Sequence, residues 1–186
     1  MRLIFLVMFQ DIQVWNYNMK TPFNESMIQS LSAGDFIYLS GFIYTARDAA
    51  HKLMHEALKK GDIPPFDYNG QVVFYAGPCP APPGKPIGSV GPTTAGRMDL
   101  YAPDLIAAGL RIMVGKGERT DEVAHAIKEY NGLYLVAVGG VAALLARCVK
   151  SSEIVGYDFL ETEAIRRLYV DKMPLIVAID GNGRRM

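Results

Sequence analysis

Segments typical of strands alternate with segments typical of helices along this chain from residue 35 onward. Runs rich in Ile, Val, Phe and Tyr are followed by stretches in which apolar residues recur every three or four positions. Strands that are buried on both faces and separated by helices are typical of an α/β domain with a largely parallel sheet. The predicted strands cover residues 35–44, 71–76, 87–90, 111–114, 133–138, 154–157 and 175–179.

The helices predicted between these strands begin at residues that suit a helix N-terminus. Thr45 is a candidate N-cap for a helix over the residues that follow, and Thr120 is a candidate N-cap for a second one. Pro103 fits the first turn of a third helix. Further helices are predicted at residues 141–149 and 161–168. Residues 77–86 carry five prolines and are expected to form a stiff, extended connector.

The composition limits the partners that such a domain can have. The chain has 186 residues, half of them hydrophobic, which is enough apolar surface for the core of one domain. Lys plus Arg and Asp plus Glu both number 19, so the formal net charge is zero. Because there is neither a basic excess nor a basic run, we expect no nucleic-acid partner, and any anion must be recognised by a few local cations.

The N-terminal segment is set apart from the rest of the chain. Residues 3–9 are apolar and follow Arg2, a pattern with a faint similarity to a secretion signal. The run is short, no small-residue cleavage pattern follows it, and it is too short to span a bilayer. We therefore predict an N-terminal extension of unknown role at residues 1–18, a single domain at residues 19–186, and no membrane association.

The cysteines and histidines argue against a metal centre held by this chain. Cys79 and Cys148 are its two cysteines, and two thiols cannot supply the ligands of an iron–sulfur cluster or a four-cysteine zinc site. The three histidines have no metal-ligand spacing with cysteines or carboxylates. A disulfide framework is not indicated either, so we expect a reducing, cytoplasmic compartment.

Cations and hydroxyls stand where three predicted strands end. Arg47 lies in the first turn of a predicted helix, Thr93, Thr94 and Arg97 follow a Gly-Pro turn, and Lys116 lies between two glycines. Ligands of α/β folds gather at the carboxyl ends of strands, where helix N-termini also favour anions. A guanidinium there can bind a carboxylate through two parallel hydrogen bonds. The pattern predicts a site for a small polyanion.

The same residues also have a structural interpretation, which the sequence leaves open. Arg47 would pair with Asp48, and Arg97 would pair with Asp99, as ordinary ion pairs. The two threonines would serve as helix N-caps, and Lys116 would be a solvated turn lysine.

Seven short motifs occur together and in one order: TARDAAHK at 45–52, IGS at 87–89, GPTT at 91–94, RMD at 97–99, GKG at 115–117, AVGG at 137–140 and AIRRL at 164–168. Together they resemble the C-terminal domain, or separate β subunit, of the class I iron–sulfur fumarases and L-tartrate dehydratases. The resemblance runs from about Met19 to the C-terminus.

The resemblance implies a three-layer, swivelling β/β/α domain with a largely parallel central sheet. It implies a hydro-lyase that reversibly hydrates fumarate to malate, with a [4Fe-4S] cluster bound by a partner α subunit and none bound by this chain. The chain is then active only with that partner, in a heterotetramer of two α and two β subunits. A homodimer of the isolated chain is an equal alternative.

The resemblance also assigns roles to residues. It places Thr93 at the position of the catalytic base and Arg47, Thr94, Arg97 and Lys116 at substrate-binding positions. A neutral hydroxyl is a poor base, so Thr93 would need nearby cations to stabilise its deprotonated form.

Two departures from the family pattern concern the substrate. Ala95 stands where many members have a small hydroxyl residue, and Leu53 stands where a basic residue is common. Fumarate hydratase is the first hypothesis, and L-tartrate dehydratase, which shares these motifs, is its alternative. A hypothesis of another class is a stand-alone dicarboxylate-binding module without catalysis.

Overall fold

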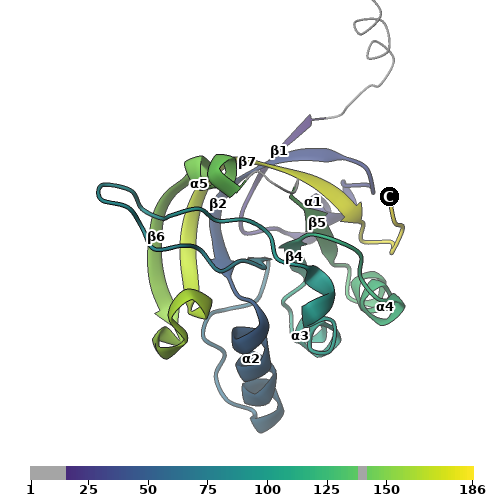
Figure 1. Ribbon diagram of the computed structural model, residues 1–186. Coiled ribbons are helices and arrows are strands. Elements are labelled where there is room, and N and C mark those ends of the chain that lie inside the picture. Colours follow the sequence, from purple (N-terminus) through teal and green to yellow (C-terminus); the bar gives the residue numbers. More distant parts are fainter. Residues whose placement is uncertain (1–15, 138–141) are drawn as a thin grey trace, which may run out of the picture.

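A computed structural model describes residues 16–137 and 142–186 of the chain (Figure 1). Strands and helices alternate through most of it, which confirms the α/β class. The strands are β1 (Asn16–Lys20), β2 (Phe36–Thr45), β3 (Val72–Phe74), β4 (Ile112–Gly115), β5 (Leu133–Val136), β6 (Val149–Gly156) and β7 (Ile165–Ile179). The α-helices are α1 (Glu25–Gln29), α2 (Asp48–Lys60), α3 (Ala102–Ala107), α4 (Asp121–Glu129) and α5 (Ala142–Cys148), and the 3₁₀ helices are η1 (Ala95–Met98) and η2 (Asp158–Glu163).

The sheet closes on itself. Its strand order is β1-β2-β3-β4-β5-β7-β6, and β2 also pairs with β7, so β2, β3, β4, β5 and β7 form a ring. Neighbours from β1 to β5 are parallel, as predicted, whereas β7 runs antiparallel to β2, β5 and β6. The ring closes because β7 is 15 residues long and reaches both β2 and β5. Five of the strands thus form a small closed barrel.

Alternate residues of the ring strands divide the core in two. One cluster holds residues from all five ring strands, together with Ile28 of α1 and Leu145 of α5, and forms the barrel interior. The intervening residues, such as Val73 and Met113, pack under α2, α3 and α4. This period of two is that of a pleated strand buried on both faces.

Three local predictions are wrong. Residues 87–90 form no strand; Ile87 and Val90 are apolar because they are buried in the core. Residues 161–168 are not a helix, since η2 ends at Glu163 and β7 then pairs with both β2 and β6. Thr45 does not cap α2 but ends β2, and its Oγ1 accepts the Arg166 N–H at 3.1 Å.

The described residues begin at Asn16, within the predicted N-terminal extension. Residues 1–15 and the last part of the AVGG motif, residues 138–140, lie outside the described residues. Strand β1 pairs with β2 and crosses position 19, where we placed the start of the domain; the boundary stays a prediction. No helix of the described part is both long and apolar enough to cross a membrane.

Candidate functional site

The candidate site lies where β2, β3 and β4 end. Arg47 lies two residues after the last residue of β2 and is the N-cap residue of α2. Thr93 is fixed beside the end of β3, because its N–H donates to the carbonyl of Tyr75 at 2.7 Å. Lys116 follows β4, and its N–H donates to the carbonyl of Thr93 at 3.2 Å. Thr94 and Lys116 form an isolated parallel bridge, so the three predicted segments meet at one end of the parallel strands.

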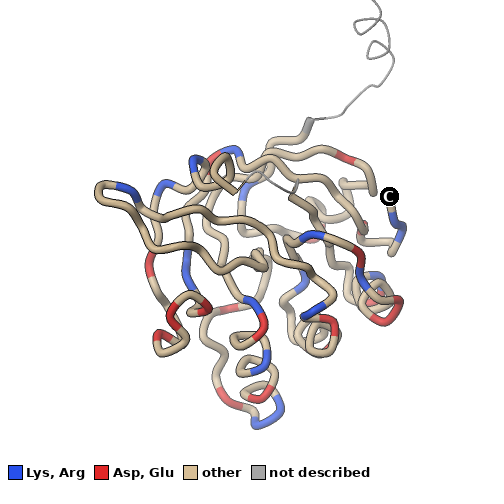
Figure 2. Tube along the Cα trace, in the orientation of Figure 1, with Lys and Arg blue, Asp and Glu red and all other residues tan. Residues whose placement is uncertain are grey.

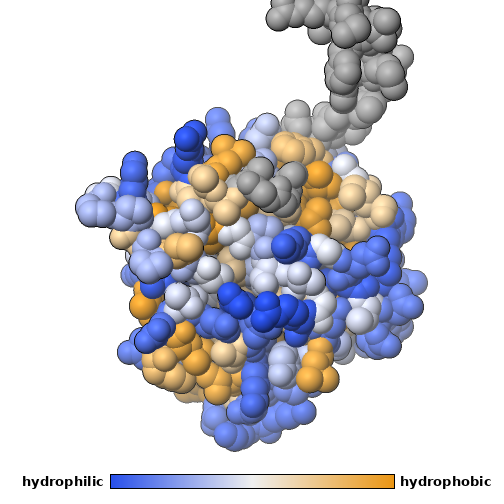
Figure 3. All heavy atoms as spheres, in the orientation of Figure 1, coloured by the Kyte–Doolittle hydropathy of each residue, from blue (hydrophilic) through white to orange (hydrophobic). Residues whose placement is uncertain are grey.

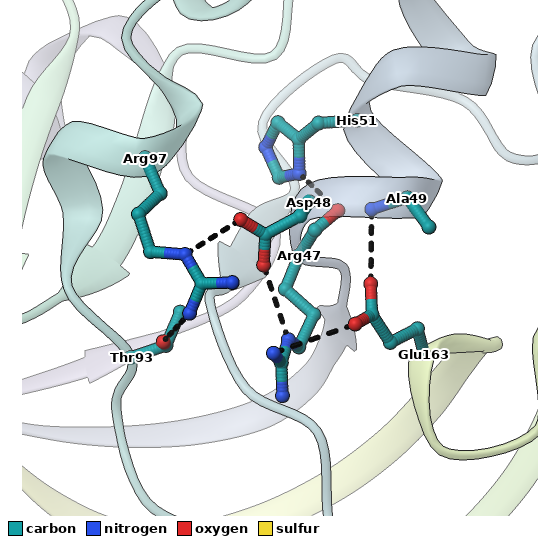
Figure 4. A network of polar contacts seen from close by, with 7 residues as sticks. All are labelled: Arg47, Asp48, Ala49, His51, Thr93, Arg97 and Glu163. Carbon is teal, nitrogen blue, oxygen red and sulfur yellow. Dashed lines mark hydrogen bonds and ion pairs between the residues drawn. The ribbon is translucent and has the colours of Figure 1, made fainter.

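Asp48 joins the two arginines of the site (Figure 4). Its Oδ1 lies 2.7 Å from Nε of Arg97, and its Oδ2 lies 3.3 Å from Nε of Arg47. Arg97 in turn reaches Thr93, with Nη1 3.4 Å from the hydroxyl Oγ1. Asp48 and Arg97 thus link Arg47 to Thr93 within one network of polar contacts.

Glu163 holds Arg47 from another part of the chain (Figure 4). This residue ends η2, and its carboxylate lies 3.4 Å from Nη2 of Arg47. The same carboxylate accepts the backbone N–H of Ala49 in the first turn of α2 at 2.9 Å. Gly77 lies against this arginine, since a Cβ there would be 3.0 Å from Nη1 of Arg47. A side chain at position 77 would require its neighbours, Arg47 among them, to shift by a few tenths of an ångström.

Lys116 and Thr94 are exposed at the same end of the sheet. Thr94 is the N-cap residue of η1, but its side chain makes no capping hydrogen bond. Within residues 16–137 and 142–186, no carboxylate pairs with the Lys116 ammonium. Lys116 also lines a cleft of ≈ 510 Å³ together with Gly117, Arg119 and Tyr134. Both residues are thus open to a ligand.

The structural interpretation of the arginines holds only in part. Arg47 does pair with Asp48, as that interpretation expected. Arg97, however, pairs with Asp48 rather than with Asp99, whose carboxylate binds Arg119 instead. The sequence analysis missed the shared carboxylate and the contribution of Glu163. Only the adjacency of Arg47 and Asp48 hinted at the first, and nothing in the sequence pointed to the second.

A buried ion pair ties two segments of the site together. Nε of Arg119 lies 2.7 Å from Oδ1 of Asp99, which directly follows η1, and Oδ2 of Asp99 accepts the N–H of Thr120 at 2.8 Å. The Arg119 guanidinium also lies over the rings of Tyr75 and Tyr134, 5.4 and 5.0 Å from their centroids. Burial raises the pKa of both tyrosines, so they stay neutral beside this cation.

His51 supports the backbone of Arg47 from inside the fold. It is buried, its Nδ1 lies 3.1 Å from the Arg47 carbonyl, and its ring packs edge-on against Tyr75. Burial lowers the pKa of His51 from 6.5 to about 4, so at neutral pH the ring is uncharged. A neutral ring with a proton on Nδ1 donates to that carbonyl and helps to fix the first turn of α2.

This burial makes stability depend on pH. The unfolded chain protonates His51 near pH 6.5 and the folded chain only near pH 4. Stability is therefore full above pH 6.5 and falls as the pH drops toward 4, by about 3 kcal/mol. Urea unfolding between pH 7 and pH 4 should show a smaller loss in His51→Gln than in wild type. His125→Gln, at an exposed histidine, is the control; equal losses in His51→Gln and wild type would contradict this assignment.

The described residues hold no group of candidate metal ligands. Cys79 is exposed and Cys148 is half-buried, and both are free thiols. No three His, Cys, Asp or Glu side chains in the described part lie together as metal ligands would. Figure 2 shows acidic and basic residues interspersed along the trace, with no single basic face in this view.

Comparison with known proteins places these features in a family. The family model described as "Fumarase C-terminus" matches residues 8–186, and so reaches into the segment that we set apart as an extension. The aerobic class I fumarate hydratase of Escherichia coli (strain K12) is 42% identical over 147 residues, which are 78% of this chain and 27% of that protein. Fumarate hydratase 1, mitochondrial, of Leishmania major is 39% identical over 172 residues, 89% of this chain and 31% of that protein.

A third relative has a length similar to that of this chain. The Methanocaldococcus jannaschii protein named "Putative L(+)-tartrate dehydratase subunit beta" is 38% identical over 166 residues, 84% of this chain and 83% of that protein. By contrast, the chain spans less than a third of the length of the two fumarate hydratases. The match over nearly the whole chain shows that it belongs to the fumarase C-terminus family.

Proposed function

We propose that this chain is the β subunit of an iron–sulfur hydro-lyase that reversibly adds water to fumarate to give malate. The observation that carries the proposal is that Arg47, Arg97 and the Thr93 hydroxyl lie in one network of polar contacts, with Lys116 joined to Thr93 through its backbone N–H. The similarity to class I fumarate hydratases over 78% of the chain supports the choice of reaction.

The arrangement suits a dicarboxylate and a proton transfer. Two guanidiniums and an ammonium can hold two carboxylates, and Thr94 is exposed beside them. In the dehydration direction, the Thr93 oxygen takes the proton from the carbon next to a carboxylate while hydroxide leaves the neighbouring carbon. In hydration, Thr93 returns that proton. Nη1 of Arg97 lies beside the Thr93 oxygen and stabilises its deprotonated form.

The partner in this proposal is an α subunit that binds the [4Fe-4S] cluster, and the chain is active only with it. The side chain of Arg97 is 49% exposed, and Thr94 and Lys116 are exposed too. These three residues therefore face solvent unless a partner covers them. Figure 3 shows hydrophilic side chains near the middle of the view, with hydrophobic surface above them and at the lower left. We propose that the domain swivels to close this face over the cluster, in a heterotetramer of two α and two β subunits.

A second candidate is the β subunit of an L-tartrate dehydratase. One specific observation favours it: the chain covers 83% of a protein whose name contains that subunit. Tartrate is also a dicarboxylate, so the cations of this site suit it equally. The free thiols of Cys79 and Cys148 support the proposal of a reducing, cytoplasmic compartment for either enzyme.

The test is reconstitution with the cluster-bearing subunit under anaerobic conditions, with fumarate, malate and tartrate each offered. The expected result is interconversion of fumarate and malate by the complex, and neither cluster absorbance nor turnover by this chain alone. Turnover of tartrate only would support the second candidate. Binding of dicarboxylates without turnover of any of them would support the stand-alone binding module and overturn the proposed activity.

Removing either arginine should mainly weaken binding. In the reconstituted enzyme, Arg47→Ala and Arg97→Ala should each weaken dicarboxylate binding by about 1.5–3 kcal/mol, because a charge-assisted hydrogen bond is lost. Inhibition by a non-reacting dicarboxylate measures this. Arg111→Ala is the matched control, since Arg111 is paired with Glu25 at 2.7 Å on another element. If both site variants bind as wild type does, the assignment of the cations is wrong.

A further inference from the structure

We propose that Asp48 and Glu163 are positioning residues for the two substrate arginines, and that Asp48 also acts on Thr93 through Arg97. This inference rests on the proposed function, because it assumes that Thr93 and the arginines meet the substrate. Neither carboxylate belongs to the set of residues to which the family resemblance gives a role.

Asp48 reduces the electrostatic repulsion between the guanidiniums of Arg47 and Arg97. Two guanidiniums that bind the same small dianion must lie close together, where they repel each other. The Asp48 carboxylate stands between them, with one oxygen on Nε of Arg97 and the other on Nε of Arg47, at 2.7 and 3.3 Å. It offsets the repulsion and restricts the rotamers of two long side chains before substrate arrives. A site prepared in this way loses less entropy on binding.

The contact with Asp48 also sets the direction of the Arg97 guanidinium. The group is planar, so a bond at Nε fixes where both Nη atoms point. With Nε on Asp48, Nη1 points to the Thr93 hydroxyl at 3.4 Å (Figure 4). Nη2 donates no hydrogen bond to any described residue, which leaves it for a carboxylate of the substrate. Loss of Asp48 should therefore impair both substrate binding and proton transfer.

Glu163 acts on Arg47 alone. Its carboxylate pairs with Nη2 of Arg47 and accepts the N–H of Ala49, and it makes no hydrogen bond or ion pair with Arg97 or Thr93. The bond to Ala49 anchors the carboxylate at the N-terminus of α2, where a negative charge is favoured. Glu163 should therefore affect substrate binding but not the proton transfer at Thr93.

The two carboxylates can be separated by kinetics of the reconstituted complex. Asp48→Asn should lower kcat by about tenfold or more and raise KM, because one amide cannot accept from two guanidiniums. Glu163→Gln should raise KM by about tenfold and leave kcat nearly unchanged, since glutamine still accepts from Ala49. Glu25→Gln is the control, because it breaks a carboxylate–arginine pair of the same 2.7 Å length on α1. Equal effects of Asp48→Asn and Glu163→Gln on kcat would overturn the inference that Asp48 acts on Thr93 through Arg97.

A second measurement needs neither partner nor turnover. In ¹⁵N-labelled full chain, the Nε–H signals of Arg47 and Arg97, identified by loss in each Arg→Lys variant, should be protected from exchange with water. Asp48→Asn should remove the protection of at least one of them, whereas Glu163→Gln should leave that of Arg97 intact. Unchanged protection in Asp48→Asn would overturn the inference. An inactive wild-type complex would instead overturn the proposed function, and the exchange measurement would still decide on positioning.

Discussion

Replacing Thr93 with alanine is expected to lower turnover of the reconstituted enzyme by about 10²–10⁴-fold, the usual contribution of a positioned base. Binding of the dicarboxylate should change little, because Arg47, Arg97 and Lys116 remain. The backbone at this position should also remain in place, since it is held through the bonds to the Tyr75 carbonyl and the Lys116 N–H. Steady-state kinetics with fumarate and malate, together with inhibitor binding, separate the two effects.

Thr93→Ser is the matched control for this prediction. Serine keeps a hydroxyl beside Nη1 of Arg97 and should retain most of the turnover. Loss of binding with retained turnover in Thr93→Ala would show that Thr93 has a structural role. In that case the base must be sought elsewhere, and the proposed chemistry of this chain is wrong.

Replacing Arg119 with methionine is expected to lower the free energy of unfolding by about 3–5 kcal/mol, the usual effect of breaking a buried ion pair. The Arg119 side chain is fully buried, and Asp99, its partner at 2.7 Å, is 7% exposed. Methionine fills part of the space but leaves the Asp99 carboxylate buried, with the Thr120 N–H as its remaining partner among the described residues. Urea unfolding of the full chain measures the change.

An exposed ion pair of the same length provides the control. Arg185 lies 2.7 Å from Asp121, whose side chain is 95% exposed, so Arg185→Met should have little effect on stability. The double variant Asp99→Asn with Arg119→Met should recover part of the loss, because no uncompensated charge is then buried. If Arg119→Met and Arg185→Met are equally stable, burial does not decide the strength of the Arg119 pair.

Much of the fold could be predicted because its signals are local. Helix α2 and strands β2, β3, β4 and β5 were expected close to where they lie, since the 3.6- and 2-residue periods of burial show in the sequence. The segment at residues 161–168 failed for the same reason: its Arg–Arg pair and apolar flanks suit a helix as well as a strand. Strand β7 forms there because β2 and β6 offer it backbone partners.

The candidate site divides in a similar way. Arg47 and Lys116 could be singled out because each follows a predicted strand, and parallel strands bring their ends together. Thr93, Thr94 and Arg97 follow the predicted strand at residues 87–90, which does not form, and Thr93 is held at the end of β3 by its hydrogen bond to Tyr75 instead. Glu163 could not be singled out, because it lies 116 positions after Arg47 and reaches it only through the course of η2. Nor could the choice of Asp48 over Asp99 as the partner of Arg97, since both acids lie within reach of an arginine in such a turn.

The amino-acid sequence by itself determined the α/β class and the order of most elements, and it singled out the cations and hydroxyl that we propose to meet a dicarboxylate. These depend on residue type and on short-range spacing. The tertiary structure alone decided that the sheet closes into a ring, that Asp48 serves two arginines and that Asp99 is buried with Arg119. Each of these groups has many possible partners in the sequence. Which partner it meets depends on the segments that the folded chain brings together.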